Sequence, residues 1–168
     1  MSSPSMTQYM FNNCSSLTSI NLSNFRTSKV NYMAGLFSEC SSLSSINLSN
    51  FDTSNVWEMN YMFDRCSNLT SIDLSNFITT RLEKTKNMFS YCSKLISIDL
   101  SNFNLSYTSD LSYMFFGCSS LTFINLSNLI ASPFTNMNHM FAQCNELKYL
   151  NILHLYDRYL SIPESLIS

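Results

Sequence analysis

The sequence predicts an α/β solenoid, in which one short unit of strand and helix repeats and stacks on itself. Three observations support this fold class. One phrase returns with small changes as CSSLTSINLSNF, CSSLSSINLSNF, CSNLTSIDLSNF, CSKLISIDLSNF and CSSLTFINLSNL. Only two glycines and three prolines occur in 168 residues, so the turns must accommodate serine and asparagine. Cysteines recur at an interval of 26 residues, at Cys14, Cys40, Cys66, Cys92, Cys118 and Cys144.

Apolar residues follow the same 26-residue period, before and after each cysteine. One unit cannot bury these residues alone, but the units above and below it can cover them. We therefore expect uniform columns of side chains in a continuous core, beside parallel strands about 4.8 Å apart. Two such columns are Met10, Leu36, Met62, Met88, Met114 and Met140, and Leu17, Leu43, Leu69, Leu95, Leu121 and Leu147.

The first half of each unit predicts a strand and the second half predicts a helix. In SSINLSN the apolar residues Ile46 and Leu48 alternate with polar ones, which is typical of a short strand. In TSNVWEMNYMFDRC, residues 53–66, the apolar spacings of three and four predict one helical stripe. Ser54 stands where a helix N-cap is expected, and Thr80 with Glu83 matches a capping box. The stripe consists of Val56, Met59, Met62, Phe63 and Cys66.

Composition and charge exclude several classes of function. Hydrophobic residues make up 45% of the chain and charged residues 12%, with a net charge of −2. Nucleic-acid binding needs a clustered surplus of lysine and arginine, so we expect no nucleic-acid partner. No stretch is apolar enough for a transmembrane helix, so we expect no membrane insertion. We expect residues 1–155 to form the solenoid and residues 156–168 to form a C-terminal cap or begin a following segment.

The run Cys66-x-x-Leu69-x-x-Ile72-x-Leu74-x-x-Phe77 has the spacing of a leucine-rich repeat. Together with the Met-Phe pair before each cysteine, it resembles the BspA-like leucine-rich-repeat surface proteins over residues 6–155. This resemblance implies about six 26-residue strand–helix repeats, with a parallel sheet on the concave face of a curved solenoid. It also implies a secreted or cell-surface protein that adheres to host proteins or other cells. The N-terminal sequence MSSPSMTQYMFNNC has no apolar core of a secretory signal, so a cytoplasmic location also remains open.

Catalytic and metal chemistry find little support in the sequence. Equivalent cysteines point the same way in a stack, which suits neither disulfide geometry nor tetrahedral zinc, so we expect buried free thiols. The two histidines, His139 and His154, have no partner in a repeat column. Two glycines cannot build a phosphate-binding loop. We therefore expect no enzymatic activity, no catalytic residue, no metal and no cofactor.

The strand residues that point away from the core form the candidate binding site. Serines flank an unbroken asparagine and aspartate column, and this small polar surface suits a protein ligand or a glycan. The alternative is that these residues only pack along the sheet, and that the chain is a structural spacer or an intracellular scaffold block of a longer array. The column consists of Asn21, Asn47, Asp73, Asp99, Asn125 and Asn151.

Aromatic residues mark two further surfaces. Three large residues replace serines beside the asparagine column, where they are either anchors of an interface or covered by residues 156–168: Phe123, Tyr149 and Leu153. We favour the second interpretation. The outward positions of the predicted helices form the other surface, with Tyr9, Tyr61, Tyr113 and Trp57.

Overall fold

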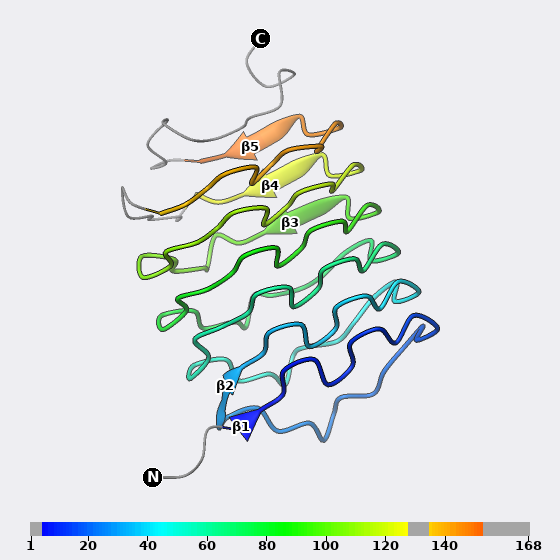
Figure 1. Ribbon diagram of the computed structural model, residues 1–168, viewed down its shortest axis with the longest axis vertical. Helices are drawn as coiled ribbons and strands as arrows, with labels where there is room; N and C mark the ends of the chain where they lie inside the picture. Colours follow the sequence, from blue (N-terminus) through cyan, green and yellow to red (C-terminus); the bar gives the residue numbers. More distant parts are fainter. Residues whose placement is uncertain (1–4, 128–134, 153–168) are drawn as a thin grey trace.

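The computed structural model describes residues 5–127 and 135–152. The chain winds into coils that stack from the N-terminal to the C-terminal end of the molecule (Figure 1). Residues 156–168, expected to form a cap, lie outside the described residues. Every strand pairing is parallel. The strands are β1 (Ser5–Met6), β2 (Val30–Tyr32), β3 (Ser97–Asp99), β4 (Phe123–Asn125) and β5 (Tyr149–Asn151).

Two lines of backbone hydrogen bonds hold each coil to the next. In one line β3, β4 and β5 pair in register, with Ser97 opposite Phe123 and Phe123 opposite Tyr149. The other line starts with β1 and β2 and continues through isolated parallel bridges. The predicted parallel arrangement is therefore confirmed, with strands no longer than three residues. The bridges join Tyr32 to Glu58, Glu58 to Lys84, Lys84 to Asp110 and Asp110 to Asn136.

The predicted helix of residues 53–66 is wrong, because no helix forms anywhere in residues 5–127 and 135–152. Ser54 does not cap a helix, and its hydroxyl instead donates to the Asp52 carboxylate at 2.6 Å. In residues 59–65 every second backbone N–H donates to a carbonyl of the following coil. In a helix it would donate to the carbonyl four residues back. The N–H groups between them donate three residues back, as in Met62 to Met59. The bonds between coils run from Met59, Tyr61, Phe63 and Arg65 to Lys84, Lys86, Met88 and Ser90, at 2.9, 2.9, 2.9 and 2.7 Å.

Each coil contains two residues in the left-handed backbone region, four positions apart. Tyr61 and Arg65 both have φ of 59°. The only two glycines of the chain, Gly35 and Gly117, occupy such positions, where the missing side chain removes the strain. At the other left-handed positions the residue has a side chain, and the backbone conformation costs about 1–2 kcal/mol. The hydrogen bonds between coils offset this conformational cost. The other left-handed residues are Tyr9, Asn13, Glu39, Asn87, Tyr91, Tyr113, His139 and Gln143.

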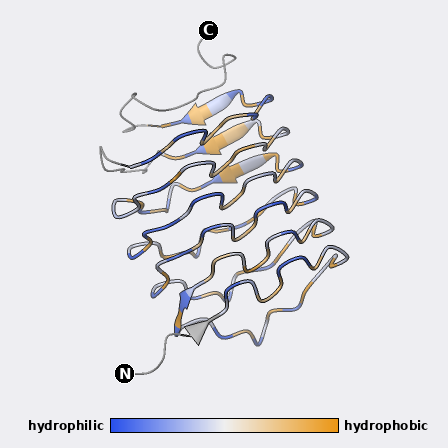
Figure 2. Cartoon of the chain, viewed as in Figure 1, coloured by the Kyte–Doolittle hydropathy of each residue, from blue (hydrophilic) through white to orange (hydrophobic). Residues whose placement is uncertain are grey.

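The core is a set of aligned side-chain columns, as the sequence predicts. Apolar residues recur at the same place in every coil (Figure 2). The residues of the predicted helical stripe, Val56, Met59, Met62, Phe63 and Cys66, are all at most 1% exposed, although they belong to tight turns. The central column is a stack of phenylalanine rings with centroids 5.6–5.8 Å apart, formed by Phe37, Phe63, Phe89, Phe115 and Phe141.

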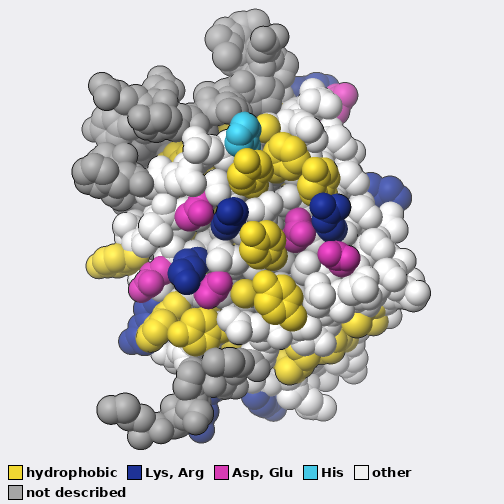
Figure 3. Space-filling view, in the orientation of Figure 1, with side chains coloured by type: hydrophobic (Ala, Val, Ile, Leu, Met, Phe, Trp, Pro, Cys, Tyr) yellow, Lys and Arg dark blue, Asp and Glu magenta, His cyan; other side chains and the backbone are white. Residues whose placement is uncertain are grey.

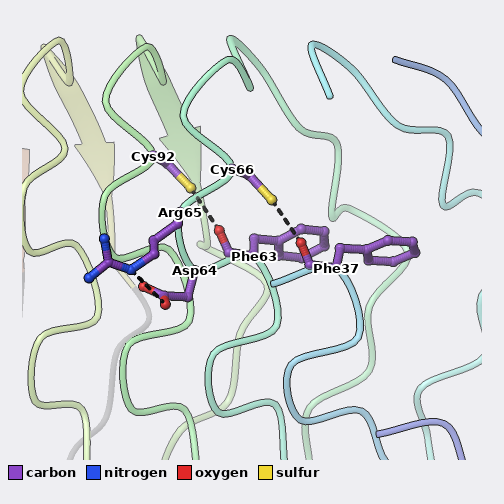
Figure 4. A network of polar contacts seen from close by, with 6 residues as sticks. All are labelled: Phe37, Phe63, Asp64, Arg65, Cys66 and Cys92. Carbon is purple, nitrogen blue, oxygen red and sulfur yellow. Dashed lines mark hydrogen bonds and ion pairs between the residues drawn. The ribbon is translucent and has the colours of Figure 1, made fainter. Parts of the chain in front are cut away.

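The six cysteines are free thiols, and five of them donate hydrogen bonds between coils. The Cys66 thiol donates to the Phe37 carbonyl, and the Cys92 thiol to the Phe63 carbonyl, both at 3.1 Å (Figure 4). Cys14 is half-buried and the other five are buried. Burial raises the pKa of Cys40 to about 11 and that of Cys144 to about 12, so these thiols stay protonated at neutral pH.

Polar side chains join the coils at the return turns. The buried Thr27 hydroxyl donates to the Asp52 carbonyl at 3.0 Å and accepts from the Asp52 N–H at 2.8 Å. The asparagine that ends the phrases at residues 47–50, 73–76 and 99–102 also reaches the preceding coil, as the Asn76 amide does to the Leu48 carbonyl at 3.1 Å. These bonds explain why serine, threonine and asparagine replace glycine and proline in the turns.

Among the described residues, no helix has the length and apolarity to span a bilayer.

Candidate functional site: the asparagine and aspartate face

All six predicted binding residues lie on one line across the coils. β3, β4 and β5 place Asp99 opposite Asn125, and Asn125 opposite Asn151. Asn125 is half-buried and the other five are exposed. We call this surface the Asx face. It comprises the column Asn21, Asn47, Asp73, Asp99, Asn125 and Asn151 and the exposed column two positions earlier, Ser19, Ser45, Ser71, Ser97, Phe123 and Tyr149.

Hydrogen bonds within each coil fix the orientation of the Asx side chains. A side-chain oxygen accepts from the backbone N–H two residues further on, which is the geometry of an Asx turn. Asn151 instead uses its amide to donate to the Asn125 side-chain oxygen at 3.1 Å. These side chains are therefore already ordered, which would lower the entropic cost of binding to this face. The turns at Asn21, Asn47, Asp73, Asp99 and Asn125 have distances of 3.0, 3.0, 3.0, 2.8 and 3.2 Å.

The two carboxylates make the middle of the Asx face negative. The Ser75 backbone N–H, which donates to Asp73, lowers the pKa of that carboxyl, and the Ser101 N–H does the same for Asp99. Both groups are therefore ionised at neutral pH. Within the described part of the chain no three His, Cys, Asp or Glu residues gather as metal ligands. Two carboxylates fall short of the six to eight oxygens that calcium takes.

Two aromatic side chains stand on the C-terminal part of the Asx face. Phe123 and Tyr149 are direct neighbours across β4 and β5. Phe123 is 39% exposed and Tyr149 is 68% exposed. Leu153, the third residue of the predicted edge, and residues 156–168, expected to cover that edge, lie outside the described residues. At the N-terminal end the face is hollowed between Asn21 and Asn47.

A second aromatic surface lies over the left-handed turns. Phe116 contacts Tyr91 and Tyr113, with ring centroids 5.2 and 5.5 Å away. Tyr113 stacks on His139 at 5.0 Å, and the Arg65 guanidinium lies 4.7 Å from the Tyr91 ring centroid. In Figure 3 hydrophobic side chains gather beside the histidine, with charged groups of both signs among them.

The sequence predicts only part of this second surface. Tyr61 and Tyr113 are half-buried, while Tyr9 and Trp57 are 52% and 42% exposed. Arg65, Tyr91 and Phe116 are not among the predicted residues. The signal that could have identified Arg65 and Tyr91 is their common column, because residues 26 positions apart lie one above the other.

An ion pair borders the second surface. The Arg65 side chain lies 3.7 Å from the Asp64 carboxylate (Figure 4). Burial raises the pKa of Asp64, while the positive charge of Arg65 opposes this shift. This pair joins neighbours in sequence and creates no cluster of convergent polar groups.

Comparisons with known proteins identify a family for the chain. A comparison with curated proteins found no match. Two similar solved structures are the leucine-rich-repeat protein TpLRR of T. pallidum and a leucine-rich cell surface protein of Faecalibacterium prausnitzii A2-165. TpLRR is 18% identical, with a TM-score of 0.49, and the match covers 83% of this chain and 69% of TpLRR. The F. prausnitzii protein is 20% identical, with a TM-score of 0.40, and the match covers 85% of this chain but 33% of that protein.

The family comparison covers most of the sequence. Residues 5–122 and 73–153 match the model of DUF285, described as a Mycoplasma protein of unknown function. Both matched segments consist of the 26-residue units that build the coils. The chain therefore belongs to the DUF285 family.

Proposed function

We propose that the protein is a non-catalytic binding module that recognises a protein ligand through the Asx face. We further propose that it is displayed on the cell surface as an adhesin of the BspA-like kind. The observation that carries the proposal is the exposed pair Phe123 and Tyr149 on a surface of small, ordered polar groups. Large aromatic side chains dominate the energy of many interfaces, and polar groups around them supply specificity.

The charge and shape of the Asx face suit contact with a folded surface. Apart from Phe123 and Tyr149 its side chains are short, so a partner can approach the backbone of several coils at once. Only Asp73 and Asp99 carry charge within the Asx column, so shape and hydrogen bonding would contribute more to affinity than electrostatic steering. These properties favour a broad contact over a small-molecule pocket.

An adhesion assay tests the proposal. Beads coated with the purified chain are applied to a monolayer of cultured epithelial cells, and the retained beads are counted. Phe123→Ser with Tyr149→Ser, and separately Asn47→Arg with Asp73→Arg, should reduce retention at least about tenfold, because each pair removes or blocks a central contact. Thr80→Arg with Ser109→Arg is the matched control, since both residues are exposed and outside the Asx face.

The outcomes separate the alternatives. Retention that is unchanged in both Asx-face variants excludes this face as the binding surface. No retention of the unaltered chain favours the structural spacer or the scaffold. If mild periodate treatment of the monolayer abolishes retention and trypsin treatment does not, the ligand is a glycan. Protease treatment of intact source cells tests the location, because a surface protein is removed while a cytosolic marker survives.

A further inference from the structure

A groove runs along one side of the stack, where the left-handed turns end. Its volume is about 360 Å³, which lies in the range of ligand-binding clefts. Glu39, Arg65 and Tyr91 belong to coils that have a described coil on both sides, so the middle of the groove does not depend on either end of the stack. We call it the flank groove. One of its two columns is Asn13, Glu39, Arg65 and Tyr91, and the other is Ser15, Ser41, Ser67 and Ser93.

The serine column supplies hydrogen-bond acceptors. The Ser41 hydroxyl donates to the Ser15 carbonyl, and the Ser67 hydroxyl donates to the Ser41 carbonyl, both at 3.4 Å. The Ser93 hydroxyl continues the row by donating to the Ser67 carbonyl at 3.3 Å. Each hydroxyl proton is therefore used, while each hydroxyl oxygen keeps lone pairs that can accept a further bond. This wall of the groove suits a ligand that carries N–H or O–H donors.

Arg65 supplies a positive charge in a fixed orientation. Its guanidinium lies 4.7 Å from the Tyr91 ring centroid, and its Nε atom lies 3.7 Å from the Asp64 carboxylate. Figure 4 shows the two terminal nitrogens of Arg65 pointing away from Asp64. Within the described part of the chain these nitrogens donate no hydrogen bond. A carboxylate of a ligand can therefore pair with the free side of the guanidinium.

The Tyr91 ring holds Arg65 in place because the next coil restricts the ring. Phe116 contacts it edge-on, with ring centroids 5.2 Å apart. The ring also lies against Gly117, where a Cβ would come within 2.7 Å of a ring carbon. Glycine at this position thus leaves the space that the ring occupies. The guanidinium consequently rests on a platform that is ordered before any ligand arrives.

Glu39 supplies the opposite charge, one coil before Arg65 in the same column. It is exposed, and in the described residues its side chain forms no ion pair or hydrogen bond. The two positions are about 4.8 Å apart, the spacing of neighbouring coils. In an extended peptide the side chains of residues i and i+2 lie on one face, about 6.7 Å apart. Long side chains can accommodate the difference, so such a peptide can pair with both charges at once.

We propose that the flank groove binds an extended segment of a partner protein that carries an acidic and a basic side chain two positions apart. The acidic side chain pairs with Arg65, the basic side chain pairs with Glu39, and N–H groups of the segment donate to the serine column. An acidic glycan would pair with Arg65 but would bring a like charge against Glu39. The flank groove and the Asx face share no residue, so this proposal goes beyond the proposed function and can fail separately from it.

Fluorescence anisotropy with labelled nonapeptides tests the proposal on the full chain. The test peptides consist of serine and threonine, with a glutamate and a lysine two positions apart at the centre, in either order. Two matched peptides carry two glutamates or two lysines at these positions. At about 20 mM salt exposed charges are little screened, and a mixed-charge peptide should bind at least about tenfold more tightly than either matched peptide.

Two charge-reversal variants should change this preference in opposite directions. Arg65→Glu should favour the two-lysine peptide, and Glu39→Arg should favour the two-glutamate peptide. Both substitutions suit the left-handed backbone, because this column already holds a glutamate with φ of 61° and an arginine with φ of 59°. Lys29→Glu is the matched control, since Lys29 is exposed and outside the flank groove, and it should keep the original preference.

Circular dichroism and thermal melting confirm that each variant folds. If Arg65→Glu does not fold, Arg65→Gln replaces it and should lose the preference for the mixed-charge peptide. No binding of a mixed-charge peptide at up to about 1 mM, or equal affinity for all the peptides, would overturn the proposal. A preference that persists in both reversal variants would place the binding elsewhere and overturn it as well. If an oligomer of galacturonic acid binds and Arg65→Glu abolishes this binding, while no peptide binds, the groove takes an acidic glycan and the proposal is wrong.

Discussion

Removing one ring from the phenylalanine stack tests whether the neighbours of a coil determine its stability. Phe63 is 0% exposed and lies between Phe37 and Phe89, with centroids 5.7 and 5.6 Å away. Phe11 occupies the same column in the first coil, where it is half-buried, stacks on Phe37 at 5.5 Å and makes a tilted contact with Phe25 at 6.1 Å. The comparison of Phe63→Ala with Phe11→Ala therefore changes the number of covering coils and keeps the chemistry constant.

The expected magnitudes follow from burial. Truncating a buried phenylalanine to alanine costs about 3–5 kcal/mol of unfolding free energy. Each aromatic neighbour contributes about 0.5–1.5 kcal/mol beyond its buried area, so Phe63, with two stacked neighbours, should lie near the upper limit. Phe11 has one stacked ring instead of two and is only half-buried, so the loss of unfolding free energy in Phe11→Ala should be about 2 kcal/mol.

Urea unfolding followed by circular dichroism measures both losses. The midpoint should fall for both variants while the slope m stays constant, because the exposed area on unfolding hardly changes. Two probes with coincident transitions are needed, since a repeat array can unfold in parts. Equal losses at Phe63 and Phe11, or a loss below about 2 kcal/mol at Phe63, would refute the dependence on neighbouring coils.

Four further predictions concern the turns, the thiols and the half-buried Asp64 carboxylate. Gly117 has φ of 73°, and a Cβ there would lie 2.7 Å from a Tyr91 ring carbon, so Gly117→Ala should lower the unfolding free energy by about 1–2 kcal/mol. Gln143→Gly, at an exposed left-handed position, should leave the thermal midpoint unchanged or raise it, and a clear loss would contradict the strain argument. In the native protein a thiol reagent such as 5,5′-dithiobis(2-nitrobenzoate) should modify Cys14 alone, because the other five cysteines are buried. Those five should react only after unfolding. Labelling of the native protein that persists in Cys14→Ser would contradict this prediction. Because burial raises the pKa of Asp64, its ionisation costs stability as pH rises through the folded-state pKa, whereas below its ordinary pKa it costs nothing. The thermal-unfolding midpoint of Asp64→Asn, relative to that of the unaltered chain, should therefore be higher at about pH 7 than at about pH 3. The reverse order would show that burial does not raise the pKa of Asp64.

The columns of the fold could be predicted because identical side chains must cover one another. Leu69, Cys66 and Met62 are each 0% exposed, as the 26-residue period requires. The same alternation in later units correctly predicts the parallel strands β3, β4 and β5, whereas residues 44–50, the SSINLSN phrase itself, form no strand. These features depend on repetition and burial, which a single sequence displays directly.

The helix could not be ruled out from the same pattern. Spacings of three and four describe a helical stripe, but they equally describe two linked tight turns whose inward residues recur at those intervals. Met59 and Phe63 are buried in either arrangement. The difference lies in the acceptor of each N–H group, a carbonyl four residues back or one in the next coil. The positions of Gly35 and Gly117 were the available hint of left-handed turns.

The predicted site residues do share one surface, although their role in binding stays a prediction. The Asx column follows from strand alternation alone. The contacts of Arg65 and Phe116 with Tyr91 depend on how successive turns overlap, which the strand–helix interpretation places differently.

The hydrogen bonds between coils have a consequence for how this protein can change in length. Among the described residues, the side-chain hydrogen bonds between coils join positions 24–29 residues apart, so each coil bonds to its immediate neighbours. Duplication or deletion of one 26-residue unit in the gene would therefore preserve the contacts on both sides of the change. It would lengthen or shorten the Asx face by one strand spacing of about 4.8 Å. Natural selection on the length of the Asx face can therefore act in uniform steps, through recombination between nearly identical coding segments. The packing of the core stays the same.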